Sequence, residues 1–63
     1  MDAHEIVKKL KATPYKFTYA HMVRDEIKKL NDEDSDFVLL ELRKAIANPD
    51  NADIVKSLRE ILN

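Results

Sequence analysis

The chain contains no glycine in 63 residues, and this absence limits its fold more than any other feature. Glycine is the residue that most readily adopts positive φ, which tight β-hairpins, many helix C-termini and phosphate-binding loops require. A P-loop and a dinucleotide-binding fingerprint are excluded, because both are built on glycines. The turns must instead be made by Asn, Asp and Pro, and this favours an all-α protein.

The composition is that of a small folded domain. Apolar residues make up 44% of the chain and charged residues 37%, which is too apolar for a disordered segment. We expect residues 1–63 to form a single helical domain, near the lower size limit for folding without disulfides or metals. Cysteine is absent, so disulfides, zinc fingers and thiol catalysis are excluded.

Two further features predict where the protein is found. The longest uninterrupted apolar run, Phe37 to Leu40, is far shorter than the roughly 20 residues of a membrane-spanning helix. The N-terminal segment 1–5 is acidic and lacks the apolar region of a secretory signal. We therefore expect a cytoplasmic protein that does not associate with membranes.

The spacing of apolar residues predicts a small bundle of four short helices. Apolar residues that recur at i, i+3, i+4 and i+7 form one buried face of a helix. This spacing, together with the turn residues, places helices at about 3–12, 19–30, 36–47 and 49–62. The short corner at Asn48-Pro49 predicts that the last two helices form an antiparallel hairpin.

Capping patterns set the expected starts of the first two helices. Asp2, followed three residues later by Glu5, is a capping-box pattern at the start of the first helix. Thr18 is the expected N-cap of the second helix. Phe17 is expected to pack on Met22 as a hydrophobic staple beside that cap.

The later connections rely on asparagine and aspartate. Asn31 is expected to end the second helix as a C′ residue in place of glycine. Asp34 or Ser35 is expected to be the N-cap of the third helix, where the neighbouring carboxylates suit the helix dipole. Asn48 is expected to cap the fourth helix, with Pro49 at the first helical position, where its missing N–H costs nothing.

The helix expected at 36–47 is apolar around most of its circumference. A helix of this kind is covered on several sides. Two interpretations stay open, because it is either the central helix of the domain or part of a homodimer interface. For the second interpretation, the expected interface residues are Phe37, Leu39, Leu40 and Ile46.

Three of the four aromatic residues lie within five positions, in a segment that departs from a plain amphipathic helix. Aromatic side chains are enriched at the centres of protein interfaces. We therefore expect a small non-enzymatic protein–protein interaction module or regulator, of the adaptor or inhibitor type, that binds a protein partner. The expected partner-binding residues are Tyr15, Lys16, Tyr19 and Arg24.

The alternative is a small nucleic-acid-binding regulator that uses the basic, aromatic-rich N-terminal half. Residues 1–30 carry seven basic and four acidic side chains, whereas residues 31–63 carry four basic and eight acidic ones. The basic half can thus contact nucleic acid, or it can simply attract the acidic half. A pI of about 6.1 is below the basic balance typical of nucleic-acid-binding domains. The cations concerned are Lys8, Lys9, Lys11, Lys16, Arg24 and Lys28.

The sequence shows no constellation typical of catalysis or of metal binding. Its two serines are Ser35, at an expected helix cap, and Ser57, on the expected outer side of the last helix, and neither is near a histidine in sequence. His4 and His21 are not at the spacing of a helical metal-ligand pair. We expect no enzyme activity, no cofactor and no metal site.

Overall fold

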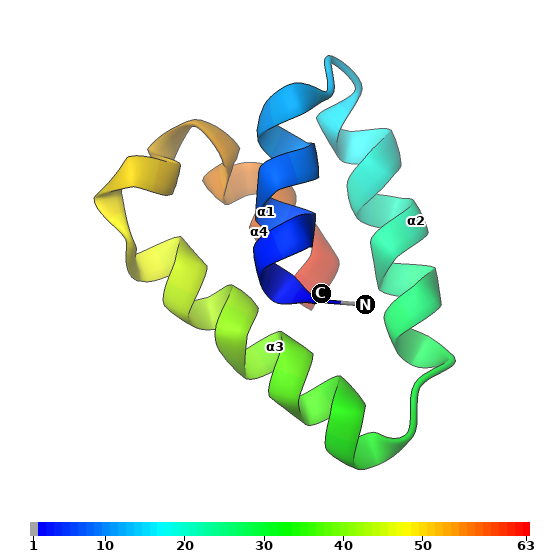
Figure 1. Cartoon of the computed structure of the whole chain (residues 1–63). Coiled ribbons are helices and arrows are strands. Elements are labelled where there is room, and N and C mark those ends of the chain that lie inside the picture. Colours follow the sequence, from blue (N-terminus) through cyan, green and yellow to red (C-terminus); the bar gives the residue numbers. More distant parts are fainter. Residues whose placement is uncertain (1) are drawn as a thin grey trace.

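The turns of the structure form without any left-handed backbone. The computed structural model describes residues 2–63, and none of these residues has positive φ. The described residues form helices and no strand, which confirms the predicted all-α bundle of four short helices (Figure 1). In chain order the elements are α1 (Ala3–Ala12), α2 (Lys16–Lys28), α3 (Asp32–Ala47), the 3₁₀ helix η1 (Pro49–Ile54) and α4 (Val55–Leu62).

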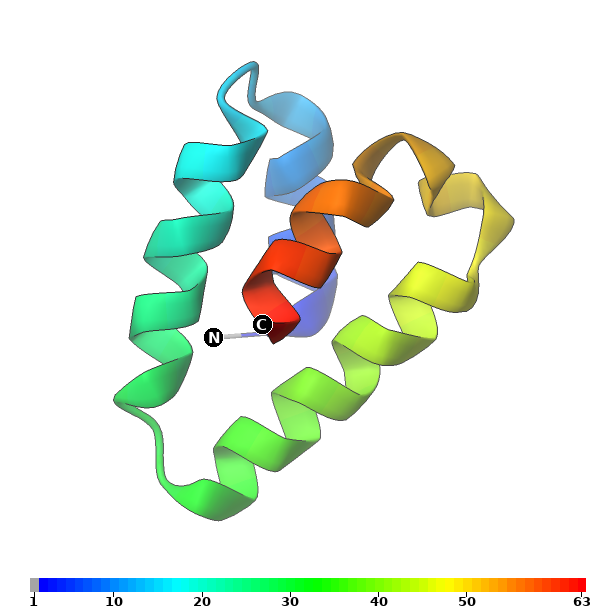
Figure 2. The ribbon, with the colours of Figure 1, turned by 180° about the vertical axis from the view of Figure 1, so that it is seen from behind.

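Helices α2 and α3 form a V whose arms meet at the connection 29–31 (Figure 1). Helix α1 covers one side of the V and α4 covers the other, as the front and back views show (Figures 1 and 2). The most extensive packing is between α2 and α4, while α1 contacts both arms. Helices α3 and α4 run in opposite directions, as predicted, although η1 lies between them (Figure 2).

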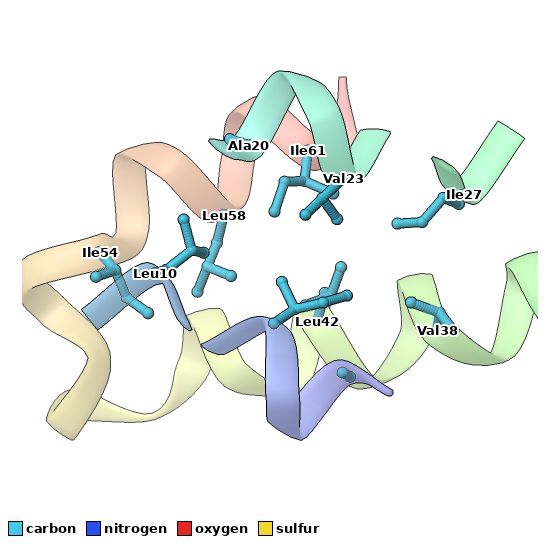
Figure 3. Close-up of a cluster of buried hydrophobic side chains, with 11 residues drawn as sticks. Leu10, Ala20, Val23, Ile27, Val38, Leu42, Ile54, Leu58 and Ile61 are labelled. Carbon is cyan, nitrogen blue, oxygen red and sulfur yellow. The ribbon is translucent and has the colours of Figure 1, made fainter. Parts of the chain in front are cut away.

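The core lies inside the V and draws on every element. Leu10 of α1, Leu42 of α3 and Leu58 of α4 are completely buried and come from three different sides (Figure 3). This arrangement removes apolar surface of all four helices from water at one place, and apolar burial is the main stabilising term for a small domain. The buried apolar residues are Ala3, Ile6, Leu10, Ala20, Val23, Ile27, Val38, Leu42, Ile54, Leu58 and Ile61.

Helix α1 has the predicted bounds. The Asp2 carboxylate accepts a hydrogen bond from the His4 backbone N–H at 3.0 Å, so Asp2 is the N-cap, as predicted. At the other end, Thr13 has extended backbone angles (φ −99°, ψ 137°). The following Pro14 explains this conformation, because proline disfavours the α region for the residue before it.

Helix α2 begins three residues earlier than predicted, at Lys16. Thr18 therefore lies inside the first turn, and the prediction that it is the N-cap is wrong. Tyr15 occupies the N-cap position and makes no side-chain cap hydrogen bond. Phe17 and Met22 are 53% and 60% exposed, so the predicted hydrophobic staple does not form.

Thr13, and not Thr18, supports the start of α2. Its hydroxyl accepts a hydrogen bond from the Tyr15 backbone N–H at 3.3 Å, and its carbonyl accepts one from the Lys16 ammonium at 3.4 Å. Both bonds lie within the segment 13–15, which connects α1 to α2, and its junction with α2.

Helix α3 also begins earlier than predicted, at Asp32. Its N-cap is Asn31, whose side-chain oxygen accepts the Asp34 backbone N–H at 2.8 Å. The predictions of Asn31 as a C′ residue and of Asp34 or Ser35 as the N-cap are therefore wrong. The carboxylates of Asp32, Glu33 and Asp34 nevertheless lie in the first turn, where they interact favourably with the helix dipole.

The last corner is capped as predicted but continues differently. The Asn48 side-chain oxygen accepts the Asp50 backbone N–H at 3.0 Å, and Pro49 is at the first helical position. The segment that follows is a 3₁₀ helix, so the α-helix predicted over 49–62 begins only at Val55.

Two polar side chains that follow this corner in sequence are buried. The Asn51 side-chain amide donates a hydrogen bond to the Ala45 carbonyl at 3.0 Å and thereby ties η1 to the end of α3. Ser57 is also buried, and the prediction that it lies on the outer side is wrong. It lies three residues after Ile54 and four before Ile61, so it shares their buried face.

Only one side of α3 faces the core. Val38 and Leu42 are buried, whereas Phe37 and Leu40 are 65% and 49% exposed. The interpretation of α3 as the central helix of the domain is therefore wrong. Its outer side forms the edge of the V that points away from α1 and α4 (Figures 1 and 2).

The capping of α3 can be tested with two alanine variants. Asn31→Ala is expected to lower the free energy of unfolding by about 1 kcal/mol, because it removes the oxygen that caps the helix. Ser35→Ala is the matched control, since Ser35 lies inside the helix. Denaturation followed by circular dichroism measures both variants. A larger loss for Ser35→Ala would contradict the observed helix start.

The orientation of α3 can be tested in the same way. Leu42→Ala is expected to cost about 2–5 kcal/mol, because it leaves a cavity in the core, whereas Leu40→Ala is expected to cost less than about 0.5 kcal/mol. Ile54→Val, a milder change expected to cost about 0.5–1.5 kcal/mol, keeps the chain folded for comparison. Denaturant midpoints at low protein concentration give the three values. Equal losses for the two leucine variants would contradict the structure.

Candidate functional site

Large apolar side chains that stay exposed are the first candidates for a binding surface. On the described residues these are Tyr15, Phe17 and Met22, at or in α2, and Phe37 and Leu40, in α3. Single exposed apolar residues are common on protein surfaces. Their grouping therefore decides whether they form a surface.

Tyr15, Tyr19 and Met22 share one side of α2. They are separated by four and three positions, which brings side chains together on one helix face. Tyr15 belongs to this helical turn, because its carbonyl accepts the Tyr19 backbone N–H at 3.1 Å. Tyr15 is 75% exposed and Met22 60% exposed, and the partly buried Tyr19 lies between them. We call these three residues the α2 stripe.

Tyr19 anchors the α2 stripe to the body of the protein. Its side chain packs against the buried core cluster. Burial raises the pKa of the Tyr19 hydroxyl above its ordinary value of 10.0, and the negative charge of Glu5 adds to the increase. Both effects disfavour the phenolate form. Since Glu5 belongs to α1, the α2 stripe lies on the side of α2 that faces α1.

Arg24 lies on the other side of α2, against α4. One of its terminal nitrogens lies 3.0 Å from His21 Nδ1, and the other lies 4.0 Å from Glu60 Oε1. His21 Nε2 is 3.7 Å from the same Glu60 oxygen. Arg24 Nε is buried and has no hydrogen-bond partner among residues 2–63. Arg24 therefore connects α2 to α4 and does not stand beside the two tyrosines.

Lys16 is also separated from the α2 stripe. Its ammonium donates to the Thr13 carbonyl at 3.4 Å, and its side chain lines a depression together with Phe17 and Lys56. The structure thus brings together only two of the four predicted partner-binding residues, Tyr15 and Tyr19. Met22 joins them, although sequence analysis assigned it to a staple with Phe17. The spacing of 15, 19 and 22 was the signal that could have found it.

The four residues predicted for an oligomer interface also divide between two sides of a helix. Phe37 and Leu40 point outward from α3. Leu39 and Ile46 are partly buried and pack against the core. Only the first pair is available to a second molecule.

The cations of the nucleic-acid alternative do not form one surface. Lys11 donates to the Asp50 carbonyl at 2.9 Å, on the side of α1 that faces η1. Arg24 faces Glu60 on α4. Lys8 and Lys9 line an open depression on α1 together with Glu5 and Ala12.

Shallow hollows of about 280, 370 and 410 Å³ lie between and on the helices. The first lies between α1 and α3 and includes His4 and Glu41. Within residues 2–63, no three His, Asp or Glu side chains are placed to hold a metal ion together. No helix of the same residues has the length and apolar character needed to cross a bilayer.

Comparison with known proteins does not assign the chain to a family. No family model matches the chain, and no curated protein and no solved structure is significantly similar to it.

The raised pKa of Tyr19 can be measured in Tyr15→Phe, a variant whose only tyrosine is Tyr19. We expect the absorbance of the phenolate to rise with a midpoint above 10.0 in the folded protein, and at about 10 in denaturant. Because the folded state holds this proton more tightly, the associated stability is complete below about pH 10 and is lost as pH rises through the folded pKa.

The contribution of α1 to this shift is tested by Glu5→Gln in the same background. Removal of the negative charge is expected to lower the folded midpoint while leaving the burial effect in place. A folded midpoint at or below that of the denatured chain would show that Tyr19 does not pack against the core.

Proposed function

We propose that this chain is a small non-enzymatic protein–protein interaction module, of the adaptor or inhibitor type, that binds a protein partner through the α2 stripe. The observation that carries the proposal is the exposure of Tyr15 and Met22 on either side of the anchored Tyr19. Tyr15 and Met22 thus remain in contact with water although the chain has an apolar core.

The attachment of the α2 stripe to a packed helix supports this role. Tyr19 and Met22 lie within a helix that packs on both α1 and α4. Association must offset the entropy of ordering the side chains that meet at the interface. Tyrosine loses little conformational freedom for the area that it covers, and residues of this type dominate binding energies. A pre-ordered stripe thus provides affinity at low entropic cost.

Charges near the α2 stripe indicate the kind of partner surface. Lys9 lies four positions after Glu5 and so shares its side of α1, and Lys8 is exposed next to it. The acidic Glu26, four positions after Met22, also lies beside the α2 stripe, but it is paired with Lys29 at 3.2 Å. We propose that the partner offers an apolar groove with an acidic rim. Rim charges of this kind affect the association rate and its salt dependence more than the affinity.

The setting that we propose is the cytoplasm, whose reducing conditions suit a chain without cysteine. The nucleic-acid alternative receives less support, because Lys11 and Arg24 are directed toward η1 and α4 and away from a common face. Phosphate binding depends on several cations that act together.

The proposal is tested with a partner captured from the native host by crosslinking and then purified for titration calorimetry. Tyr15→Ala and Met22→Ala are each expected to weaken binding at least about tenfold, as is typical of central interface residues. Phe17→Ala is the matched control, because Phe17 is an exposed aromatic residue of the same helix that lies outside the α2 stripe. Its effect is expected to stay below about threefold.

Two results would contradict the proposal. The first is a partner whose affinity is unchanged by Tyr15→Ala and by Met22→Ala. The second is a mobility shift of random duplex or single-stranded DNA at low salt that disappears steeply as salt is added, which is the behaviour of phosphate binding.

A further inference from the structure

The outer side of α3 has the spacing of a helix-pairing seam. Glu33, Phe37, Leu40, Lys44 and Ala47 are separated by four, three, four and three positions. This alternation is the heptad spacing by which one helix packs along another. All five residues are exposed, and all belong to α3. We call them the α3 seam.

Charge changes sign along the α3 seam. The acidic Glu33 and Asp36 are near its N-terminal end, Phe37 lies in the middle, and the basic Arg43 and Lys44 are near its C-terminal end. Asp36 and Arg43 are one heptad apart and so lie on the same edge of the seam. A face that is acidic at one end, apolar in the middle and basic at the other is complementary to its own reversed copy.

Most charged side chains on and beside the α3 seam are available to pair with a second molecule. The ion pairs within residues 2–63 involve neither Glu33 nor Asp36 nor Arg43. Lys44 pairs with Glu41 of the same helix at 3.1 Å. An exposed pair of this type contributes little to stability, so Lys44 can exchange it for another carboxylate.

We propose that a second copy of this chain docks antiparallel on the α3 seam and forms a two-fold symmetric dimer. A two-fold interface uses the same patch of both molecules. With the axis centred between Phe37 and Leu40, each Phe37 packs on Leu40 of the other copy. Each Glu33 then lies opposite Lys44, and Asp36 meets Arg43 on the edge.

The antiparallel direction follows from electrostatics. A parallel pair would place Glu33 against Glu33 and Lys44 against Lys44, and such like-charge contacts are destabilising. The antiparallel pair has one unfavourable edge, where Asp34 approaches Glu41 of the other copy. Lys44, which lies beside Glu41, offsets part of this repulsion.

The dimer is expected to be weak. The α3 seam spans two heptads, fewer than the three or four of a typical coiled coil. Leu39 and Ile46 cannot extend it, since they pack against the core of their own chain. We expect dissociation in the high-micromolar range. This inference is independent of the proposed function, because the α2 stripe lies on the other arm of the V.

Sedimentation equilibrium from about 10 µM to about 1 mM protein tests the dimer, over the range in which weak association becomes measurable. The mass is expected to rise from 7.3 kDa toward twice that value. Leu40→Lys is expected to weaken association more than about tenfold. Met22→Lys, a similar change at an exposed apolar residue of α2, is expected to leave the dimer unchanged. Circular dichroism confirms that both variants are folded.

Charge reversal tests the direction of pairing. Glu33→Lys and Lys44→Glu are each expected to weaken the antiparallel dimer about three- to tenfold, because each creates two like-charge contacts. The double variant restores opposite charges across the axis and is expected to return close to the original affinity. It carries the helix-dipole cost of both changes, so a loss of helix stability cannot produce this recovery.

Three outcomes would overturn the proposal. A mass of 7.3 kDa at every concentration would show that the α3 seam does not bind a second copy of this chain. A dimer that survives Leu40→Lys would use another surface. A dimer that both single reversals leave unchanged, or that the double reversal fails to restore, would not be antiparallel through these residues.

Discussion

The packing of α4 against one face of the V, opposite α1, is the interaction on which the other contacts depend. Leu58 and Ile61 of α4 are almost completely buried there, as is Ile54 at the end of η1, and α4 and α2 pack more extensively than any other pair of elements. The contact of Arg24 with Glu60 lies at the rim of this interface at 4.0 Å and is partly exposed, so it contributes little. Apolar burial by α4 holds α2 and α3 at an angle to each other. In this arrangement α2 exposes the α2 stripe and α3 exposes the α3 seam.

The parts of the fold that local sequence determines were predictable. Helix α1 and the Asn48-Pro49 corner follow directly from capping rules, because one residue satisfies each rule. The starts of α2 and α3 were not predictable from capping rules. At α2 the N-cap position holds Tyr15, which makes no side-chain cap hydrogen bond. Asn31 can end one helix or begin the next, and only packing selects between them. The bond that ties η1 to the end of α3 joins residues six positions apart and follows from no local capping rule.

The candidate surfaces were predictable only in part, for a related reason. The clustering of aromatic residues identified Tyr15 and Tyr19. The residues that lie next to these tyrosines depend on which side of α2 faces α1 and which faces α4. Proximity in sequence therefore groups Arg24 with the tyrosines, although Arg24 faces α4. In α3, apolar residues surround the helix, so sequence could not separate Leu39, which packs against the core, from Leu40, which is exposed.

The absence of positive φ from residues 2–63 has a consequence for the unfolded chain. At average usage a protein of this length would contain about four glycines, each of which broadens the denatured ensemble. Replacing a glycine by a residue with a Cβ at a compatible site stabilises a protein by about 0.4–1 kcal/mol, mainly by reducing the entropy of the unfolded state. A backbone that needs no left-handed residue thus gains about 2–4 kcal/mol in this way. For a domain of 63 residues, that amount is a substantial part of the total stability.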